Sequence, residues 1–192
     1  SFHSENTVDV MGNEGPSSVT ILNDKGYRLE SEFSGKKIIQ VITDKGGWAV
    51  NPMMGSTTPP VIPDEMYKQS KDQIDMGGPL YNYAAKGNKV ELQGTEAGAY
   101  KLKVTSPDSV ETTIYIDSAT HFMTKVSRSA TVMGQSVEVS STFSDYKKTD
   151  FGILFPFTVE IRYGGQFSLT AKAKKSEIKQ EVDPKIFERP KS

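Results

Sequence analysis

The chain of 192 residues contains no cysteine, and its only histidines are His3 and His121. The absence of cysteine excludes disulfides, thiol nucleophiles, iron–sulfur clusters and cysteine-based zinc sites. Two histidines are too few for a multi-histidine metal centre. We therefore expect neither a metal nor any other cofactor.

The sequence also lacks an excess of either charge and a long apolar run. Its 23 Lys and Arg residues face 24 Asp and Glu residues, for a net charge of −1. Because the two signs are interspersed, the sequence has no cluster of basic residues that would indicate nucleic-acid binding. No apolar run approaches the roughly 20 residues of a membrane-spanning helix. The chain begins with Ser rather than Met, so we expect a processed or trimmed form from which any signal peptide has been removed.

What the sequence does contain is β-forming residues and turns. Serine and threonine supply 36 residues, and Gly, Asn and Asp cluster at short, regular intervals. Such spacing is typical of antiparallel β-sheets, and most of the segments between turns alternate apolar and polar residues. Strands are predicted at 17–23, 27–34, 37–43, 48–51, 89–93, 99–105, 112–117, 121–128, 136–146, 157–163 and 166–174.

One excursion, residues 51–86, interrupts this pattern. It opens with a Pro/Met/Gly-rich loop, continues as a predicted helix over 63–76, and ends in a second short helix predicted over 80–86. We found no internal repeat and no linker. The prediction is a single mainly β domain over 1–192, in which a curved antiparallel sheet forms an unclosed β-barrel with a short helical lid.

The apolar residues around the excursion are the candidate binding site. Four of the seven methionines fall between 53 and 76, and methionine is frequent on surfaces that accept varied apolar partners. Ordinary packing of the lid on the sheet is the alternative explanation. The residues predicted to line a ligand cavity are Trp48, Val50, Met53, Met54, Met66, Ile74, Met76 and Leu80. We place the Trp48 ring beneath the lid, at the cavity edge.

The remaining polar groups do not predict catalysis. His121 has no accompanying serine or acid at a triad spacing, and His3 is expected in a frayed terminus. Lys172 and Lys174 alternate with alanines, a pattern that predicts the solvent-exposed face of an edge strand. Four carboxylates in the predicted helix suit a solvated face better than acid–base chemistry: Asp64, Glu65, Asp72 and Asp75. We assign no catalytic residues and expect a protein that is not an enzyme.

Several short segments resemble one known family. Residues 47–55, Gly-Trp-Ala-Val-Asn-Pro-Met-Met-Gly, resemble the Trp-x-x-Asn-Pro-x-x-Gly signature of Bacteroidetes outer-membrane lipoprotein-sorting-like proteins. Further resemblances lie, in order, at 75–80, 86–92, 99–105, 144–147 and 152–157. The wider group is similar to the periplasmic lipoprotein carriers LolA and LolB.

The resemblance implies an unclosed barrel that binds acyl chains without covalent chemistry. It implies sorting of lipoproteins or lipids to the outer membrane, in the periplasm or on the periplasmic face of that membrane. Acyl chains or lipoproteins would be the partners, with an envelope protein as a further one, and we expect a monomer. The carrier proper secures its lid with an arginine, for which Arg28, Arg128 and Arg162 are the candidates. The alternative function is an envelope sensory or protein-interaction module that uses the same half-barrel without a lipid.

Overall fold

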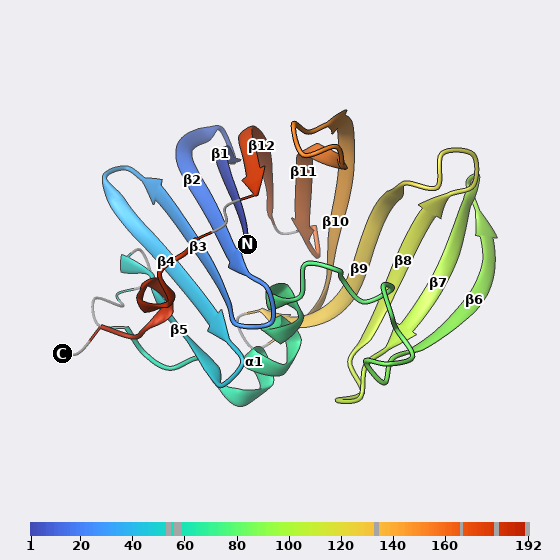
Figure 1. The fold of residues 1–192 in the computed structure, drawn as a ribbon, viewed down its shortest axis with the longest axis horizontal. Helices are drawn as coiled ribbons and strands as arrows, with labels where there is room; N and C mark the ends of the chain where they lie inside the picture. Colours follow the sequence, from blue (N-terminus) through green and yellow to red (C-terminus); the bar gives the residue numbers. More distant parts are fainter. Residues whose placement is uncertain (53–54, 56–58, 133–134, 166, 179–180, 191–192) are drawn as a thin grey trace.

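A computed structural model describes the chain except for residues 53–54, 56–58, 133–134, 166, 179–180 and 191–192. The described part is mainly β, with one antiparallel sheet of 12 strands in the order β5-β4-β3-β2-β1-β12-β11-β10-β9-β8-β7-β6 (Figure 1). The edge strands β5 and β6 do not pair, so the sheet is an unclosed barrel, as predicted. The strands are β1 (Phe2–Val10), β2 (Asn13–Leu22), β3 (Gly26–Phe33), β4 (Lys36–Thr43), β5 (Gly46–Val50), β6 (Lys89–Glu96), β7 (Ala99–Thr105), β8 (Glu111–Asp117), β9 (Met123–Val132), β10 (Gln135–Lys148), β11 (Leu154–Tyr163) and β12 (Phe167–Ile178).

The N-terminal residues form a central strand, which the sequence did not reveal. Strand β1 pairs with β2 on one side and with β12 on the other, so it joins the two ends of the chain into one sheet. His3 is therefore ordered, and its Nδ1 lies 2.9 Å from the Thr20 hydroxyl. For the same reason Lys172 belongs to an interior strand. The predictions of a frayed terminus at His3 and of an edge strand at Lys172 were therefore wrong. Both errors have one cause: the N-terminal segment is too polar to be identified as a strand from its own sequence.

The sheet is strongly curved, and pairing register shows which face is concave. Residues directly opposite one another in antiparallel strands lie on the same face of the sheet. Following the paired residues from β3 through β2, β1 and β12 to β11 places Tyr27 and Tyr163 on the same face. In a flat sheet, the four strand spacings alone would separate them by roughly 19 Å, and their offset along the strands would add to this. Instead, the charge of Tyr163 contributes to the pKa of Tyr27. On the same face, the rings of Phe2 and Phe155 lie 5.2 Å apart across β12. This face is the concave one.

The excursion crosses the opening of the curved sheet (Figure 1). Helix α1 (Asp64–Ser70) begins after Pro63 and continues as the 3-10 helix η2 (Lys71–Ile74); we call α1 and η2 together the lid helices. The second helix predicted over 80–86 is wrong: this segment is a series of turns. A Gly-Gly-Pro sequence precedes it, and Asn82 adopts a left-handed conformation with φ 51°, which an α-helix does not accommodate.

A compact core lies on the outer face of β3–β5, beneath the C-terminal segment. Residues 181–190, which we call the strap, contain the 3-10 helix η3 (Pro184–Phe187) and run across these strands. Phe187 packs against Val41 and Trp48, and all three are at most 6% exposed. Gly26 permits this contact, because a Cβ at that position would lie 2.6 Å from the Phe187 ring. The strap thus completes the outer layer of one half of the sheet.

Candidate functional site

The lid helices are attached to the β3–β4 side of the sheet by polar contacts. The Tyr67 hydroxyl donates to the Thr43 carbonyl at 2.9 Å. Beyond α1, the Asp24 amide donates to the Ile74 carbonyl at 2.9 Å, and Asn23 accepts from the Met76 amide at 2.8 Å. These bonds hold the lid helices near the β2–β3 turn and the end of β4.

A second set of contacts attaches the lid helices to the opposite side of the sheet. Arg128 on β9 donates through Nη1 to the carbonyl of Gln69 in α1. Lys71 forms an ion pair with Asp108 in the β7–β8 turn. Of the three arginines considered as the residue that secures the lid, Arg128 is therefore the one that contacts the lid helices. Arg28 instead donates to the strap at the Ile186 carbonyl, and Arg162 lies on the outer face beside Glu160.

Below the lid helices, polar side chains gather on the concave face. Val139 pairs with both Arg128 and Tyr163, so the three share this face. Burial raises the pKa of the Tyr163 phenol, and burial, with a smaller effect of Tyr163, raises the pKa of Tyr27 to about 12. Both phenols are therefore neutral near pH 7. Burial lowers the pKa of Arg128, an effect that the charge of Asp72 opposes.

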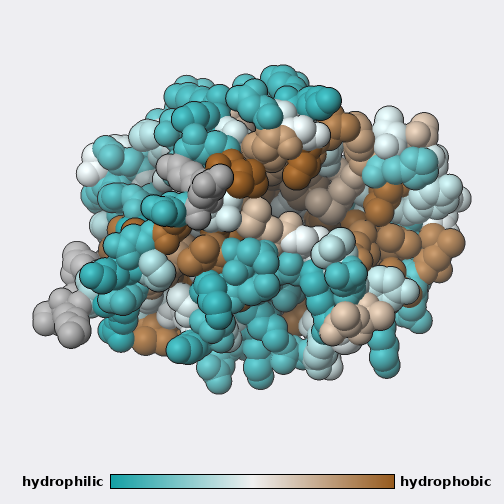
Figure 2. Space-filling view, in the orientation of Figure 1, coloured by the Kyte–Doolittle hydropathy of each residue, from teal (hydrophilic) through white to brown (hydrophobic). Residues whose placement is uncertain are grey.

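Next to this polar region the concave face is apolar and partly exposed. On β6, β7 and β8 the inward positions carry mostly apolar side chains, which we call the apolar wing: Val90, Leu92, Tyr100, Leu102, Val104, Ile114 and Ile116. Leu92 is 64% exposed and Tyr100 is 38% exposed, whereas Ile114 is fully buried. Figure 2 shows apolar side chains on this side of the molecule, beside a hollow. Single exposed apolar residues are common, but neighbouring ones on a concave surface indicate a binding site.

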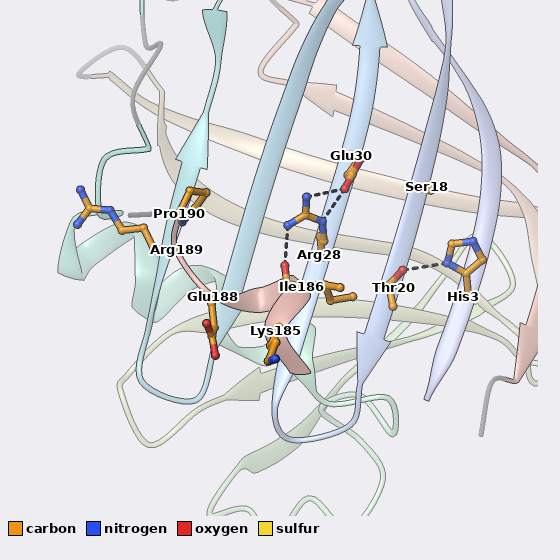
Figure 3. Close-up of a pocket in the computed structure, with 10 residues that line it drawn as sticks. All are labelled: His3, Ser18, Thr20, Arg28, Glu30, Lys185, Ile186, Glu188, Arg189 and Pro190. Carbon is orange, nitrogen blue, oxygen red and sulfur yellow. Dashed lines mark hydrogen bonds and ion pairs between the residues drawn. The ribbon is translucent and has the colours of Figure 1, made fainter. Parts of the chain in front are cut away.

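The outer face carries two open grooves, one on each side of η3. One has a volume of about 650 Å³ and is lined mostly by polar and charged residues (Figure 3). In it Arg28 bonds to Glu30 and to the Ile186 carbonyl, so its guanidinium secures the strap. The other, of about 680 Å³, reaches the edge of Trp48 between the strap and Val61. These grooves border the strap, and neither lies on the concave face.

The predicted cavity residues do not all come together. Trp48 and Val50 lie on the outer face, where the Trp48 indole N–H donates to the Phe187 carbonyl at 3.0 Å. The expected position of this ring beneath the lid is therefore wrong. Met66 and Met76 are exposed in the excursion, and Ile74 and Leu80 are partly buried. Met53 and Met54 lie outside the described residues.

Sequence reasoning missed Tyr27, Tyr163, Leu92 and Tyr100 as residues of the concave face. Each is an ordinary member of an alternating strand, and alternation alone does not show which face is concave. Within the part of the chain that the structure describes, no group of three or more His, Asp or Glu side chains could hold a metal ion. No described helix has the length and apolar character needed to cross a membrane.

No family model matches the chain, and no curated protein matches it. Two solved structures share its fold over 97% of its length. One, described as an outer membrane lipoprotein-sorting protein domain from Vibrio parahaemolyticus, has a TM-score of 0.59 at 12% identity, with 88% of that chain covered. The other, a DUF1329 family protein from Desulfovibrio piger, has a TM-score of 0.60 at 14% identity, with 89% of that chain covered.

Proposed function

We propose that this protein, whose fold is that of LolA/LolB-like lipoprotein-sorting domains, binds acyl chains or lipoproteins on its concave face. The observation that carries the proposal is the apolar wing, where Leu92 and Tyr100 stay exposed on the curved inner face of an unclosed barrel. The chemistry is non-covalent. Transfer of one CH₂ group from water contributes about 0.8 kcal/mol, so a chain of about 14 carbons offers on the order of 10 kcal/mol before ordering costs.

The attachment of the lid helices supports the same function. Polar bonds from Tyr67, Arg128 and Lys71 hold these helices at both sides of the opening. Individual hydrogen bonds contribute only about 0.5–1.5 kcal/mol net. The lid helices can therefore give way to a chain without disturbing the core beneath the strap. Met66, Ile74, Met76 and Leu80 remain proposed contacts from the lid side.

The proposed role places the protein in the periplasm or on the periplasmic face of the outer membrane. There it would carry or receive lipoproteins or lipids, and it would not act as an enzyme. The fold shared with a lipoprotein-sorting domain supports this role. The presence of co-purifying lipid in native mass spectrometry is the direct observation to seek.

The experiment compares variants at two exposed apolar sites. Replacing Leu92 and Tyr100 together by Gln removes exposed apolar surface from the apolar wing. We expect binding of a fluorescent fatty-acid probe to weaken at least about tenfold, which corresponds to about 1.4 kcal/mol. Stability should change little, because both side chains are already exposed in the folded state. Met11→Gln is the matched control: Met11 is 76% exposed in the β1–β2 turn, away from the concave face.

Two results would contradict the proposal. One is unchanged probe binding in the double variant. The other is a wild-type protein that carries no lipid and shows no saturable binding of the probe. The latter result would favour the alternative, an envelope sensory or interaction module without a lipid cargo.

A further inference from the structure

The guanidinium of Arg128 is partly buried on the concave face with most of its donors unused. A guanidinium presents five N–H donors, and one bond, to the Gln69 carbonyl, is present among the described residues. In the same part of the chain no carboxylate lies close enough to form an ion pair with Arg128. The charge of Asp72 on η2 acts on Arg128, but among the described residues Asp72 forms no ion pair with it, so most of the guanidinium donors remain available to an anion.

Two phenols extend the donor set. Tyr163 and Tyr27 lie on the same face as Arg128, and their hydroxyls have no hydrogen-bond partner among the residues described. Tyr163 is close enough to Arg128 for the two charges to interact, and Tyr27 is similarly close to Tyr163. Because both phenols are neutral near pH 7, each can donate its proton to an oxygen. Three side chains from three strands therefore present donors to one region.

The lid side of this region also contains an unsatisfied polar group. Gln73 lies one helical turn after Gln69, and its Oε1 atom is buried without a partner among the described residues. A buried acceptor without a hydrogen bond costs about 1–3 kcal/mol. Because this oxygen is an acceptor, it bonds a donor and not an anionic oxygen, so Gln73 adds a polar atom to η2 but no contact to an anion.

This polar region continues directly into the apolar wing. Val126 and Arg128 are two residues apart on β9 and share the concave face, and Val126 pairs with Ile114 on β8. From Ile114 the same face continues through Leu102 to Leu92 at the open edge of the sheet. The surface therefore has a cationic inner end and an apolar outer end, which is the polarity of a single-chain amphiphile.

We infer that the ligand is an anionic amphiphile whose charged oxygens accept hydrogen bonds from Arg128, Tyr163 and Tyr27, with its chain along the apolar wing. This inference rests on the proposed function and adds the class of head group. The shared chemistry is an anionic oxygen, supplied either by a fatty-acid carboxylate or by a phosphate monoester. Charge-assisted hydrogen bonds are about twice as strong as neutral ones, so the head group determines selectivity while the chain supplies most of the affinity.

The test measures selectivity as well as affinity. Dodecanoate, dodecyl phosphate and dodecanol share one chain and differ in the head group, and each is titrated by displacement of a fluorescent fatty-acid probe. We expect the wild type to bind at least one anionic probe about tenfold or more tightly than dodecanol. Whichever anion binds more tightly identifies carboxylate or phosphate as the source. Arg128→Gln should reduce the ratio to within about threefold, and Arg128→Lys should restore part of it.

Controls separate head-group binding from the attachment of the lid helices. If Arg128 only holds the lid helices, Arg128→Gln changes the affinities for all three probes equally and leaves their ratio intact, which would overturn the inference. Equal binding of the three probes by the wild type would overturn it too. Tyr163→Phe should weaken binding of the anionic probes alone. Arg162→Gln, on the exposed outer face, should change nothing. If the wild type binds none of the probes, the proposed function itself fails.

Discussion

Removal of the Phe187 ring should detach the strap from the outer face and expose the only tryptophan. Phe187 is 6% exposed and packs on Val41 and Trp48, and it is the buried residue of η3. Phe→Ala changes in protein cores cost about 3–5 kcal/mol. Because the strap lies outside the sheet and contacts it through η3, the loss is limited to the free energy that docks the strap. We therefore expect Phe187→Ala to lower the free energy of unfolding by about 3 kcal/mol.

The assay uses Trp48 as a reporter. In the folded protein its indole is 4% exposed and donates to the Phe187 carbonyl. When the strap detaches, water reaches the indole, and its emission should shift to the red before any denaturant is added. Urea unfolding followed by circular dichroism gives the change in stability. Gly26→Ala tests the same contact from the sheet, since its new Cβ would meet the Phe187 ring at 2.6 Å.

Ile153→Ala is the matched control, because Ile153 is apolar but 58% exposed before β11. It should leave both emission and stability nearly unchanged. If Phe187→Ala keeps the wild-type emission and loses less than about 1 kcal/mol, below the range for a core aromatic residue, the Phe187 ring does not hold the strap on the sheet. Since Trp48 lies on the outer face, we also expect its emission to stay constant when an acyl ligand binds to the concave face.

Two further predictions concern polar contacts. Tyr67→Phe removes the hydrogen bond to the Thr43 carbonyl. Amide hydrogen exchange in α1 should become faster by a factor that corresponds to about 0.5–1.5 kcal/mol. Exchange of the β12 amides should stay unchanged and is the control. Glu30 is the second: burial acts to raise its pKa, but bonds from Lys37 and Arg28 outweigh this and lower it. Its stabilisation is therefore present above the ordinary glutamate pKa, near 4.3, and is lost as the pH falls through the lower folded-state value. In urea unfolding, Glu30→Gln should thus lower the free energy of unfolding near neutral pH but much less at about pH 3. A loss of unfolding free energy that is the same at both pH values would contradict this.

Local sequence signals were enough to predict the β architecture and the position of the excursion. Turn residues at regular intervals and alternating apolar residues are local signals, so most strands from Ser17 onward were predicted near their observed bounds. The helix following Pro63 was predicted for the same reason. Strand β1 was missed because its residues are mostly polar, and its stability comes from β2 and β12 rather than from its own pattern.

Which face of the sheet is concave could not be predicted from these local signals. Alternation separates two sets of residues on each strand, but the direction in which a sheet curves depends on all 12 strands together. That curvature brings Tyr27 and Tyr163 together although 136 residues separate them in the sequence (163 − 27). It also places Arg128 beneath the lid helices and puts Trp48 on the opposite face, under a strap from the far end of the chain. Contacts between residues so distant in sequence follow from register and curvature, which no local pattern encodes.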